Sequence, residues 1–273
     1  MQNGGMGMAG DFIITGGRPL RGTVQIPAAK NSVLPLLAAS MLCTGRVRLQ
    51  NVPLLADVST SRKLLQSVGC TVRRQGADLL VESTPSACCP DPEQTAQMRA
   101  SILFCAPLLA RLGRVETVLP GGCKIGERPV DLHLSGLERM GAECRQEGER
   151  LILTAPAGLH GAAITLGFPS VGATETLLLA AATARGTTVL RGAAREPEIA
   201  DLAAFLNRCG ACVRGGAALV IAALAARGES RVSGTGFIDR GYADLAAQMT
   251  RLGAQMTREM HPGTGECKKR PSK

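Results

Sequence analysis

ILFCAPLLARLGRVETVLPG, residues 102–121, contains the pattern that decides the fold of this 273-residue chain. Leucine and alanine recur in it at helical spacing, Gly113 can end the helix in a left-handed conformation, and a short β-branched strand follows. A second helix, HLSGLERMGAEC (133–144), comes after an irregular loop. The stretch therefore predicts a helix, a strand and a second helix that pack as one unit.

The same pattern recurs, so that the chain holds four copies of the unit. After the first two closing helices, GADLLVES (76–83) and GERLILTAP (148–156) indicate paired strands. The complete unit is therefore helix, strand, helix, strand, strand, and the predicted fold class is α/β. The three further copies begin with LPLLAASMLCTGRVRLQNVP (34–53), TLLLAAATARGTTVLRGAA (176–194) and LVIAALAARGESRVSGTG (219–236), and they close with SRKLLQSVGCTV (61–72), DLAAFLNRCGACV (201–213) and DLAAQMTRLGAQM (244–256).

The fourth copy follows the third more closely than the other copies follow one another. The glycines after the four first helices are Gly45, Gly113, Gly186 and Gly228. Their intervals are 68, 73 and 42 residues. The chain passes from GACV (210–213) into the next apolar helix without a two-strand segment. Either the fourth unit is specialised or a segment has been lost near residues 213–217, naturally or through an artefact.

Composition and charge narrow the class of protein. A net charge of +9 favours an anionic partner, but one Tyr and no Trp provide no stacking platform for single-stranded nucleic acid, so we expect no nucleic-acid partner. Ten cysteines, several of them inside apolar helical stretches, indicate free thiols in a cytoplasmic protein. The N-terminus does not resemble a signal peptide, and no apolar run has membrane-spanning length, so we expect no membrane partner. The oligomeric state is left open.

The loop PGGCKIGERPVDLH (120–133) carries the strongest chemical signal. Cys123 lies on it before a helix N-terminus and between Lys124 and Arg128, and these surroundings favour the thiolate. The thiol could act as a nucleophile or as a proton donor and acceptor, or it could be a loop cysteine without a role. His133 is expected to orient this loop or a ligand.

Polar residues also open the helices of the other units. Lys30 and Asn31 suit an anion at a helix start, although a solvated Lys is common there. Residues 170–174 could form an anion cradle or an ordinary N-cap. Corresponding loops of stacked repeats lie on one face, so we expect one shared site. The loops of the second, third and fourth units add Arg99, Arg195, Glu196, Glu198, Asp239 and Arg240.

Metal and cofactor motifs are weak or missing. Cys209 and Cys212 have redox-motif spacing, but no second pair and no nearby His completes a zinc set, so we expect no metal. The sequence has no GxGxxG fingerprint and no Walker loop, which argues against nucleotide cofactors of those types. We expect no cofactor.

Together the motifs resemble the UDP-N-acetylglucosamine enolpyruvyl transferase family, from about residue 12 to about residue 257. The resemblance implies an inside-out α/β barrel, with helices inside, sheets outside, and six units in two domains. It implies transfer of the enolpyruvyl group of phosphoenolpyruvate to the 3-hydroxyl of UDP-N-acetylglucosamine, with release of phosphate, at the start of peptidoglycan synthesis. The segments that carry it are IPAAKNSVLPLLAAS (26–40), NVPLLADV (51–58), MRASILFCAPLLARLG (98–113), LPGGCKIGERPVDLHLSGLERMGA (119–142), SVGATETLLLAA (170–181), AAREPEIADLAAFL (193–206) and IDRGY (238–242).

The resemblance also implies roles for single residues. Lys30 would contact phosphoenolpyruvate, and Asn31 would contact the sugar. Cys123 would take part in proton transfer at the enolpyruvyl methylene and would be alkylated by fosfomycin. The residues implied to hold phosphate and carboxylate groups are Arg99, Arg128 and Arg240, of which Arg240 joins Lys30 and Cys123 as catalytic candidates. The residues implied to contact the uridine diphosphate are Asp131, Ser170, Val171 and Gly172, and Arg214 matches a further family arginine.

By motif the four units match the first, second, third and sixth of the family, so the second domain is expected to be incomplete. One unmatched unit carries the family's aspartate base, and we expect little or no turnover from this chain alone. The alternative is a catalytically inactive remnant or a UDP-sugar-binding module. The expected domains are 1–20 as an N-terminal strand segment of the second domain, 21–213 as a three-repeat domain, 214–257 as the remaining repeat, and 258–273 as a disordered basic tail.

Overall fold

The computed structural model describes residues 29–121, 130–214 and residue 250. The first unit contains α1 (Lys30–Ala39), the 3₁₀ turn η1 (Ser40–Leu42), β1 (Arg46–Leu49), α2 (Ala56–Ser67), β2 (Thr71–Gln75) and β3 (Asp78–Glu82). The second contains α3 (Pro92–Gln97), the 3₁₀ segment η2 (Arg99–Phe104), α4 (Cys105–Leu112), β4 (Arg114–Val118), α5 (Asp131–Arg139), β5 (Glu143–Glu147) and β6 (Arg150–Thr154). The third contains β7 (Ala163–Thr165), α6 (Val171–Ala181), β8 (Val189–Arg191) and α7 (Pro197–Arg208).

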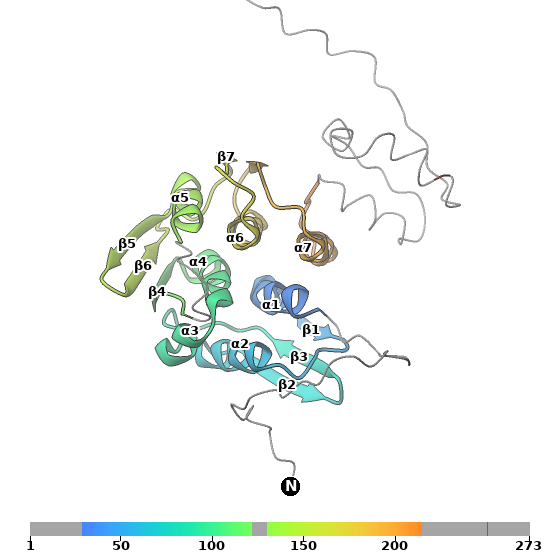
Figure 1. The fold of residues 1–273 in the computed structure, drawn as a ribbon. Coiled ribbons are helices and arrows are strands. Elements are labelled where there is room, and N and C mark those ends of the chain that lie inside the picture. The colour runs from blue at the N-terminus through green and yellow to red at the C-terminus, as the bar shows by residue number, and fades with distance from the viewer. Residues whose placement is uncertain (1–28, 122–129, 215–249, 251–273) are drawn as a thin grey trace, which may run out of the picture.

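Helices occupy the centre of the described part of the chain, and small sheets lie around them (Figure 1). The five consecutive residues 173–177 of α6 are all buried, and a helix that is buried on every side belongs in a core rather than on a surface. By contrast, four of the five residues of the edge strand β5 are exposed. This is the inside-out α/β arrangement that the family resemblance implied.

Two of the sheets have the same antiparallel topology. The first has the strand order β1-β3-β2 and the second has the order β4-β6-β5, so the third strand of each unit lies in the middle. Val81 of β3 pairs with Val47 and with Val72, and it is fully buried. In the third unit, β7 and β8 form a parallel pair. The predicted order of helix, strand, helix, strand, strand is therefore confirmed in the first two units.

A glycine was predicted to end the first helix of each unit, and it does so in one of the three described units. Gly113 caps α4 in the left-handed conformation, with φ of 70°. The prediction was wrong for Gly45, because η1 tightens the end of α1 and Cys43 then leaves the helix in an extended conformation, with φ of −81°. Gly186 has a positive φ of 89°, but α6 already ends at Ala181.

The first helix of the second unit is also divided. Residues 99–104 form the 3₁₀ segment η2, and the α-helix begins only at Cys105. Pro107 has no N–H to bond back to the preceding turn, which favours this change of helix type. No helix among the described residues is both long enough and apolar enough to cross a bilayer.

Candidate functional site

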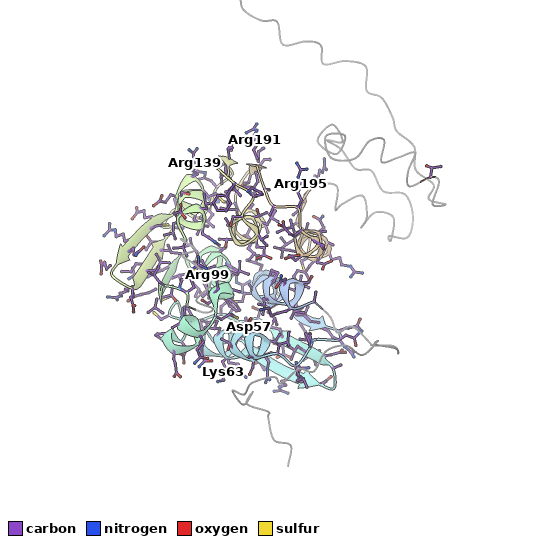
Figure 2. The ribbon with its side chains drawn as sticks, viewed as in Figure 1. Asp57, Lys63, Arg99, Arg139, Arg191 and Arg195 are labelled. Atoms are coloured by element: carbon purple, nitrogen blue, oxygen red, sulfur yellow. The ribbon has the colours of Figure 1, made fainter. Side chains whose placement is uncertain are left out.

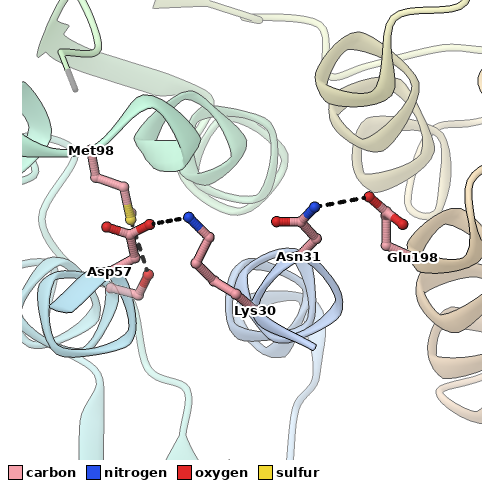
Figure 3. Close-up of polar contacts among 6 residues, drawn as sticks. Lys30, Asn31, Asp57, Met98 and Glu198 are labelled. Atoms are coloured by element: carbon pink, nitrogen blue, oxygen red, sulfur yellow. Dashed lines mark hydrogen bonds and ion pairs between the residues drawn. The ribbon is translucent and has the colours of Figure 1, made fainter. Parts of the chain in front are cut away.

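The first turn of α1 holds two of the predicted site residues in opposite directions. Lys30 Nζ forms an ion pair with Asp57 Oδ2 at 2.9 Å, at the start of α2. Asn31 Nδ2 donates to Glu198 Oε1 at 3.3 Å, in the first turn of α7. Figure 3 shows Lys30 pointing toward α2 and Asn31 toward α7. The starts of α1, α2 and α7 are therefore joined by polar side chains.

Arg99 stands at the start of η2, directly after the buried residue Met98. Ser61 Oγ of α2 donates to Met98 Sδ at 3.6 Å, so the segment directly before Arg99 contacts α2. The charge of Arg99 also acts on His133 of α5. Figure 2 shows Arg99 and Asp57 among the central helices, whereas Arg139 and Arg191 lie near one edge of the molecule.

His133 links α5 to α6 in the interior. Its Nδ1 lies 2.8 Å from Thr176 Oγ1. The pKa of His133 is lowered to about 4, chiefly by burial and also by the charge of Arg99, while Asp131 has the opposite effect. The imidazole is therefore neutral at pH 7. A Cβ at Gly172 would lie 3.1 Å from His133 Cε1, so the absence of a side chain lets the start of α6 approach the ring closely.

Ser170 caps α6. Its Oγ accepts from the backbone N–H of Ala173 at 3.3 Å, which is the ordinary N-cap that the sequence left open as one alternative. Thr174 Oγ1 donates to Ser170 O at 2.7 Å and accepts from the N–H of Ala194 at 3.0 Å. The start of α6, which includes Val171, is therefore fixed to the loop before α7.

Glu175 is a buried carboxylic acid that the sequence did not indicate. Only 6% of its surface is exposed, and burial raises its pKa to about 8, with additional contributions from the charges of Glu198 and Glu196. Its position inside an Ala- and Leu-rich helix was the available signal. Helical periodicity alone predicts a helix with a single buried stripe, which would allow a Glu to face solvent.

These contacts connect the helix starts into one group, which we call the N-terminal ring. Helix starts carry partial positive charge, and the ring adds the cations Lys30 and Arg99. Asp57 and Glu198 hold Lys30 and Asn31 in place. Such a site is suited to a ligand that carries phosphate or carboxylate groups. The ring consists of Lys30, Asn31, Asp57, Arg99, Asp131, His133, Ser170, Gly172 and Glu198.

Some predicted site residues are not placed in the ring. Cys123, Arg128 and Arg240 lie outside the described residues. The chain of the Cys123 loop leaves the described part at Gly121 and returns at Val130, directly before Asp131 of the ring. Arg214 is exposed and follows the C-terminal end of α7, so the structure does not bring it to the helix starts.

A separate pocket of about 470 Å³ lies beside the start of the Cys123 loop, between α3 and the end of β4. Its charged lining groups are Glu93 and Glu149. No lysine or arginine among the described residues lines this pocket, whereas the N-terminal ring contains Lys30 and Arg99 beside its carboxylates, so the ring is the better candidate site for an anionic ligand.

Comparison with known proteins supports the fold and the lineage. Residues 14–218 match the family model described as EPSP synthase (3-phosphoshikimate 1-carboxyvinyltransferase). The UDP-N-acetylglucosamine 1-carboxyvinyltransferase of Acidiphilium cryptum is 53% identical over 203 residues, which are 74% of this chain and 49% of that protein. The protein of the same name from Oleidesulfovibrio alaskensis is 44% identical over 250 residues, 88% of this chain and 58% of that protein. The chain thus spans about half the length of the curated relatives it matches.

Two solved structures share the fold. The enolpyruvyl transferase NikO from Streptomyces tendae aligns with a TM-score of 0.62 at 22% identity, over 70% of this chain and 45% of that one. EPSP synthase from Acinetobacter baumannii aligns with a TM-score of 0.51 at 18% identity, over 62% of this chain and 40% of that one. Since the family model covers most of the chain and these structures share its inside-out arrangement, the chain belongs to the EPSP synthase family.

Proposed function

We propose that this chain acts in the transfer of the enolpyruvyl group of phosphoenolpyruvate to the 3-hydroxyl of UDP-N-acetylglucosamine, in cytoplasmic peptidoglycan synthesis. The observation that carries the proposal is the N-terminal ring, which gathers Lys30, Asn31 and Arg99 at helix starts. All three residues lie within the segment that matches relatives named for this activity.

The chemistry of the ring fits both substrates. Phosphoenolpyruvate carries a phosphate and a carboxylate, and the cations Lys30 and Arg99 can pair with them. Asp57 pairs with Lys30 at 2.9 Å, so we infer that the substrate anion competes with Asp57 for the ammonium group. We assign Asn31 to the sugar, and Asp131 with residues 170–172 to the uridine diphosphate.

The proposed reaction is an addition followed by an elimination. The sugar 3-hydroxyl oxygen bonds to C2 of phosphoenolpyruvate, its proton leaves, and the C3 methylene gains a proton. The resulting tetrahedral intermediate then loses phosphate from C2 and a proton from C3, which gives the enolpyruvyl ether. We assign Cys123 to proton transfer at C3, and Arg128 and Arg240 to the phosphate and carboxylate, where positive charge stabilises the developing negative charge.

A second candidate function follows from the length of the match. The relatives are about twice as long as the matched segment. In a reaction between two substrates, the relative positioning of the substrates supplies a large part of the rate, and the family resemblance implies that two domains provide it. If the second domain is incomplete, the first domain would bind UDP-N-acetylglucosamine without turning it over. This second candidate is a UDP-sugar-binding module.

Phosphate release with both substrates, compared with each substrate alone, separates the two candidates. Release that needs both substrates, and that disappears in Lys30→Ala, supports transfer. Lys63→Ala is the matched control, because Lys63 is an exposed lysine on α2, the helix that carries Asp57, but outside the ring. If no release occurs, a rise in the thermal midpoint with UDP-N-acetylglucosamine, lost in Asn31→Ala, supports the binding module. If the chain neither releases phosphate nor binds UDP-N-acetylglucosamine, both candidates are contradicted.

The role of Cys123 is tested independently. Intact-mass measurement after fosfomycin treatment in the presence of UDP-N-acetylglucosamine is expected to show one adduct, absent in Cys123→Ser. If the native chain gains no adduct while the denatured chain still reacts with a general thiol reagent, the proposed site around Cys123 is not formed.

A further inference from the structure

Two cysteines meet at the end of the α1–α7 contact that is opposite to the N-terminal ring. Cys43 follows η1, and Cys209 follows α7. Their Sγ atoms lie 3.2 Å apart, although the residues are separated by 166 positions in the sequence. The two thiols therefore join the first unit of the fold to the third.

The local backbone allows the two sulfur atoms to come closer. Cys43 has an extended conformation, and Cys209 is the C-cap of its helix, so neither residue lies in the middle of a regular helix. A disulfide needs an S–S distance of about 2.05 Å, which is reached by a shift of about 1.2 Å. Side-chain rotation at two helix ends can supply such a shift.

The helices on which the cysteines lie are held together at their other ends. Asn31 donates to Glu198, and Ser32 Oγ donates to Asp201 Oδ2 at 2.5 Å. These contacts fix the direction of α7 relative to α1. The meeting of the two thiols is thus part of a continuous helix contact rather than an isolated approach of two loops.

Cys212 lies close to Cys209 in the sequence, but it does not occupy the position beside the Cys209 sulfur. The turn after α7 is fixed by Asn207, whose Nδ2 donates to Val213 O at 3.0 Å and whose Oδ1 accepts from the Val213 N–H at 2.7 Å. Within the described residues, the thiol that contacts Cys209 Sγ is Cys43. No group of three or more metal-binding side chains was found among those residues.

We propose that Cys43 and Cys209 form a thiol–disulfide modification site, at which a small disulfide such as oxidised glutathione converts the two thiols to one intramolecular disulfide. Cysteine pairs of cytoplasmic proteins that form disulfides do so transiently, in response to oxidants. The modification joins the first and third units covalently and leaves the N-terminal ring at the other end of α1 and α7.

The reaction proceeds by two thiol–disulfide exchanges. The Cys209 thiolate attacks one sulfur of oxidised glutathione, so that a mixed disulfide forms and one glutathione thiolate leaves. The Cys43 thiolate then attacks the Cys209 sulfur, the Cys43–Cys209 bond forms, and the second glutathione thiolate leaves. The two departing thiolates take up the two protons that the cysteines lose. Two cysteine thiols are oxidised, and one glutathione disulfide is reduced to two thiols.

Exposure and charge determine the order of the two steps. Cys209 is exposed and reaches the small disulfide first, whereas Cys43 is half-buried. The pKa of Cys43 is raised to about 12, chiefly by burial and also by its hydrogen bond and charge interaction with Cys209, while Arg111 acts in the opposite direction. Once Cys209 is in a mixed disulfide, its thiol no longer raises the pKa of Cys43, but burial still does, so the second exchange is expected to be the slower of the two.

The test uses the full chain, fully reduced and then incubated with oxidised glutathione. We expect an unreduced digest in which the peptides of Cys43 and Cys209 are linked to each other, with a mass about 2 Da below the sum of the two free peptides and with no glutathione on either. The thermal midpoint is expected to rise on oxidation and to return after reduction, because the bond closes a long loop of the unfolded chain.

Variants distinguish this pair from the other thiols. Cys209→Ser is expected to abolish the linked peptide. Cys88→Ser should leave it unchanged, although Cys88 also lies near a thiol, 3.6 Å from Cys89. A disulfide that maps to Cys209 and Cys212, or a glutathione adduct on Cys209 that is never displaced, would overturn the proposal. The result does not depend on enolpyruvyl transfer, since no substrate is present.

Discussion

The contact between α5 and α6 differs in kind from the contact between α1 and α7. The α5–α6 contact is buried, with the His133–Thr176 hydrogen bond and a close approach of Gly136 to Leu177. The α1–α7 contact has polar pairs that reach the surface, including Asn31–Glu198. Both contacts attach the third unit to an earlier unit and include core residues, such as Leu202 and Leu206 of α7, but the first turns of α1 and α7 meet through exposed polar pairs.

The difference indicates which contact can change. Buried side chains stabilise a contact through close packing, and their replacement leaves a cavity or an unpaired polar group. Exposed polar pairs typically stabilise a protein by less than about 1 kcal/mol. We therefore expect α5 and α6 to move as one body, and the first turns of α1 and α7, which carry Asn31 of the N-terminal ring, to adjust more easily.

The largest expected effect is the loss of packing between α5 and α6. Leu177 is fully buried, so Leu177→Ala is expected to reduce the free energy of unfolding by about 2–5 kcal/mol, measured by urea denaturation. Leu178→Ala is the matched control on the same helix, because Leu178 is only partly buried. Equal losses in the two variants would contradict the view that α6 is fixed through its contact with α5.

A double-mutant cycle tests the same contact more directly. A Cβ at Gly136 would lie 2.5 Å and 2.8 Å from the two Cδ atoms of Leu177. Gly136→Ala is therefore expected to destabilise the wild-type chain, and to be tolerated in the Leu177→Ala background, where the added methyl group has space. An additive result would show that the two residues are not coupled.

The second expected effect is a gain in the free energy of unfolding, and it concerns the buried Glu175. Its pKa is raised to about 8 by burial and by nearby Glu198 and Glu196, above the value of 4.5 that is usual for a glutamic acid. The folded chain thus holds the proton more tightly than the unfolded chain. The contribution of Glu175 to stability is fully present below pH 4.5 and is lost as the pH rises through about 8.

Glu175→Gln keeps the shape of the side chain and removes the charge. We expect the free energy of unfolding to rise by about 1–3 kcal/mol at pH 8, and the difference from wild type to vanish near pH 4.5. Thermal unfolding across this pH range measures it, with the exposed Glu138→Gln on α5 as a control. A pH-independent difference would mean that Glu175 is ionised in the folded chain.

The third effect is the loss of the buried hydrogen bond between α5 and α6. Thr176→Val removes the hydroxyl group beside His133 Nδ1, and we expect the free energy of unfolding to fall by about 1–2 kcal/mol. Thr176→Ser keeps the hydroxyl group and should lose less stability.

The buried His133 also predicts a pH dependence. Because burial lowers the pKa of His133 to about 4, the contribution of His133 to stability is present above pH 6.5 and is lost as the pH falls through about 4. A flat stability profile in that range would exclude a buried neutral imidazole.

The sequence predicted the positions that follow from the repeat and missed those that depend on packing between distant segments. Lys30, Asn31 and Arg99 were expected at helix starts, because each unit begins its first helix at a corresponding place. The ion pair of Lys30 with Asp57 was not predicted, since it depends on how α1 and α2 pack. The inside-out arrangement came from the family resemblance, because helical periodicity alone indicates one buried stripe per helix.

Two further features show why local patterns were insufficient. Glu175 is buried because α6 is surrounded on all sides, which its own sequence does not reveal. The sequence directed attention to the spacing of Cys209 and Cys212, whereas the structure pairs Cys209 with Cys43 in another unit. Contacts across 166 residues arise from the packing of α7 on α1, which follows from the order of whole elements.

The smallest effect on stability is expected at the α1–α7 contact. Ser32 Oγ donates to Asp201 at an exposed position, so Ser32→Ala should reduce the free energy of unfolding by less than about 1 kcal/mol, close to the effect of Ser59→Ala on the exposed face of α2. A loss larger than that of Thr176→Val would reverse the comparison between the two contacts. Asn31→Ala is expected to change the free energy of unfolding in urea by a similarly small amount and yet to weaken UDP-N-acetylglucosamine binding. An exposed polar group at a helix start contributes little to stability but can form a hydrogen bond with a ligand.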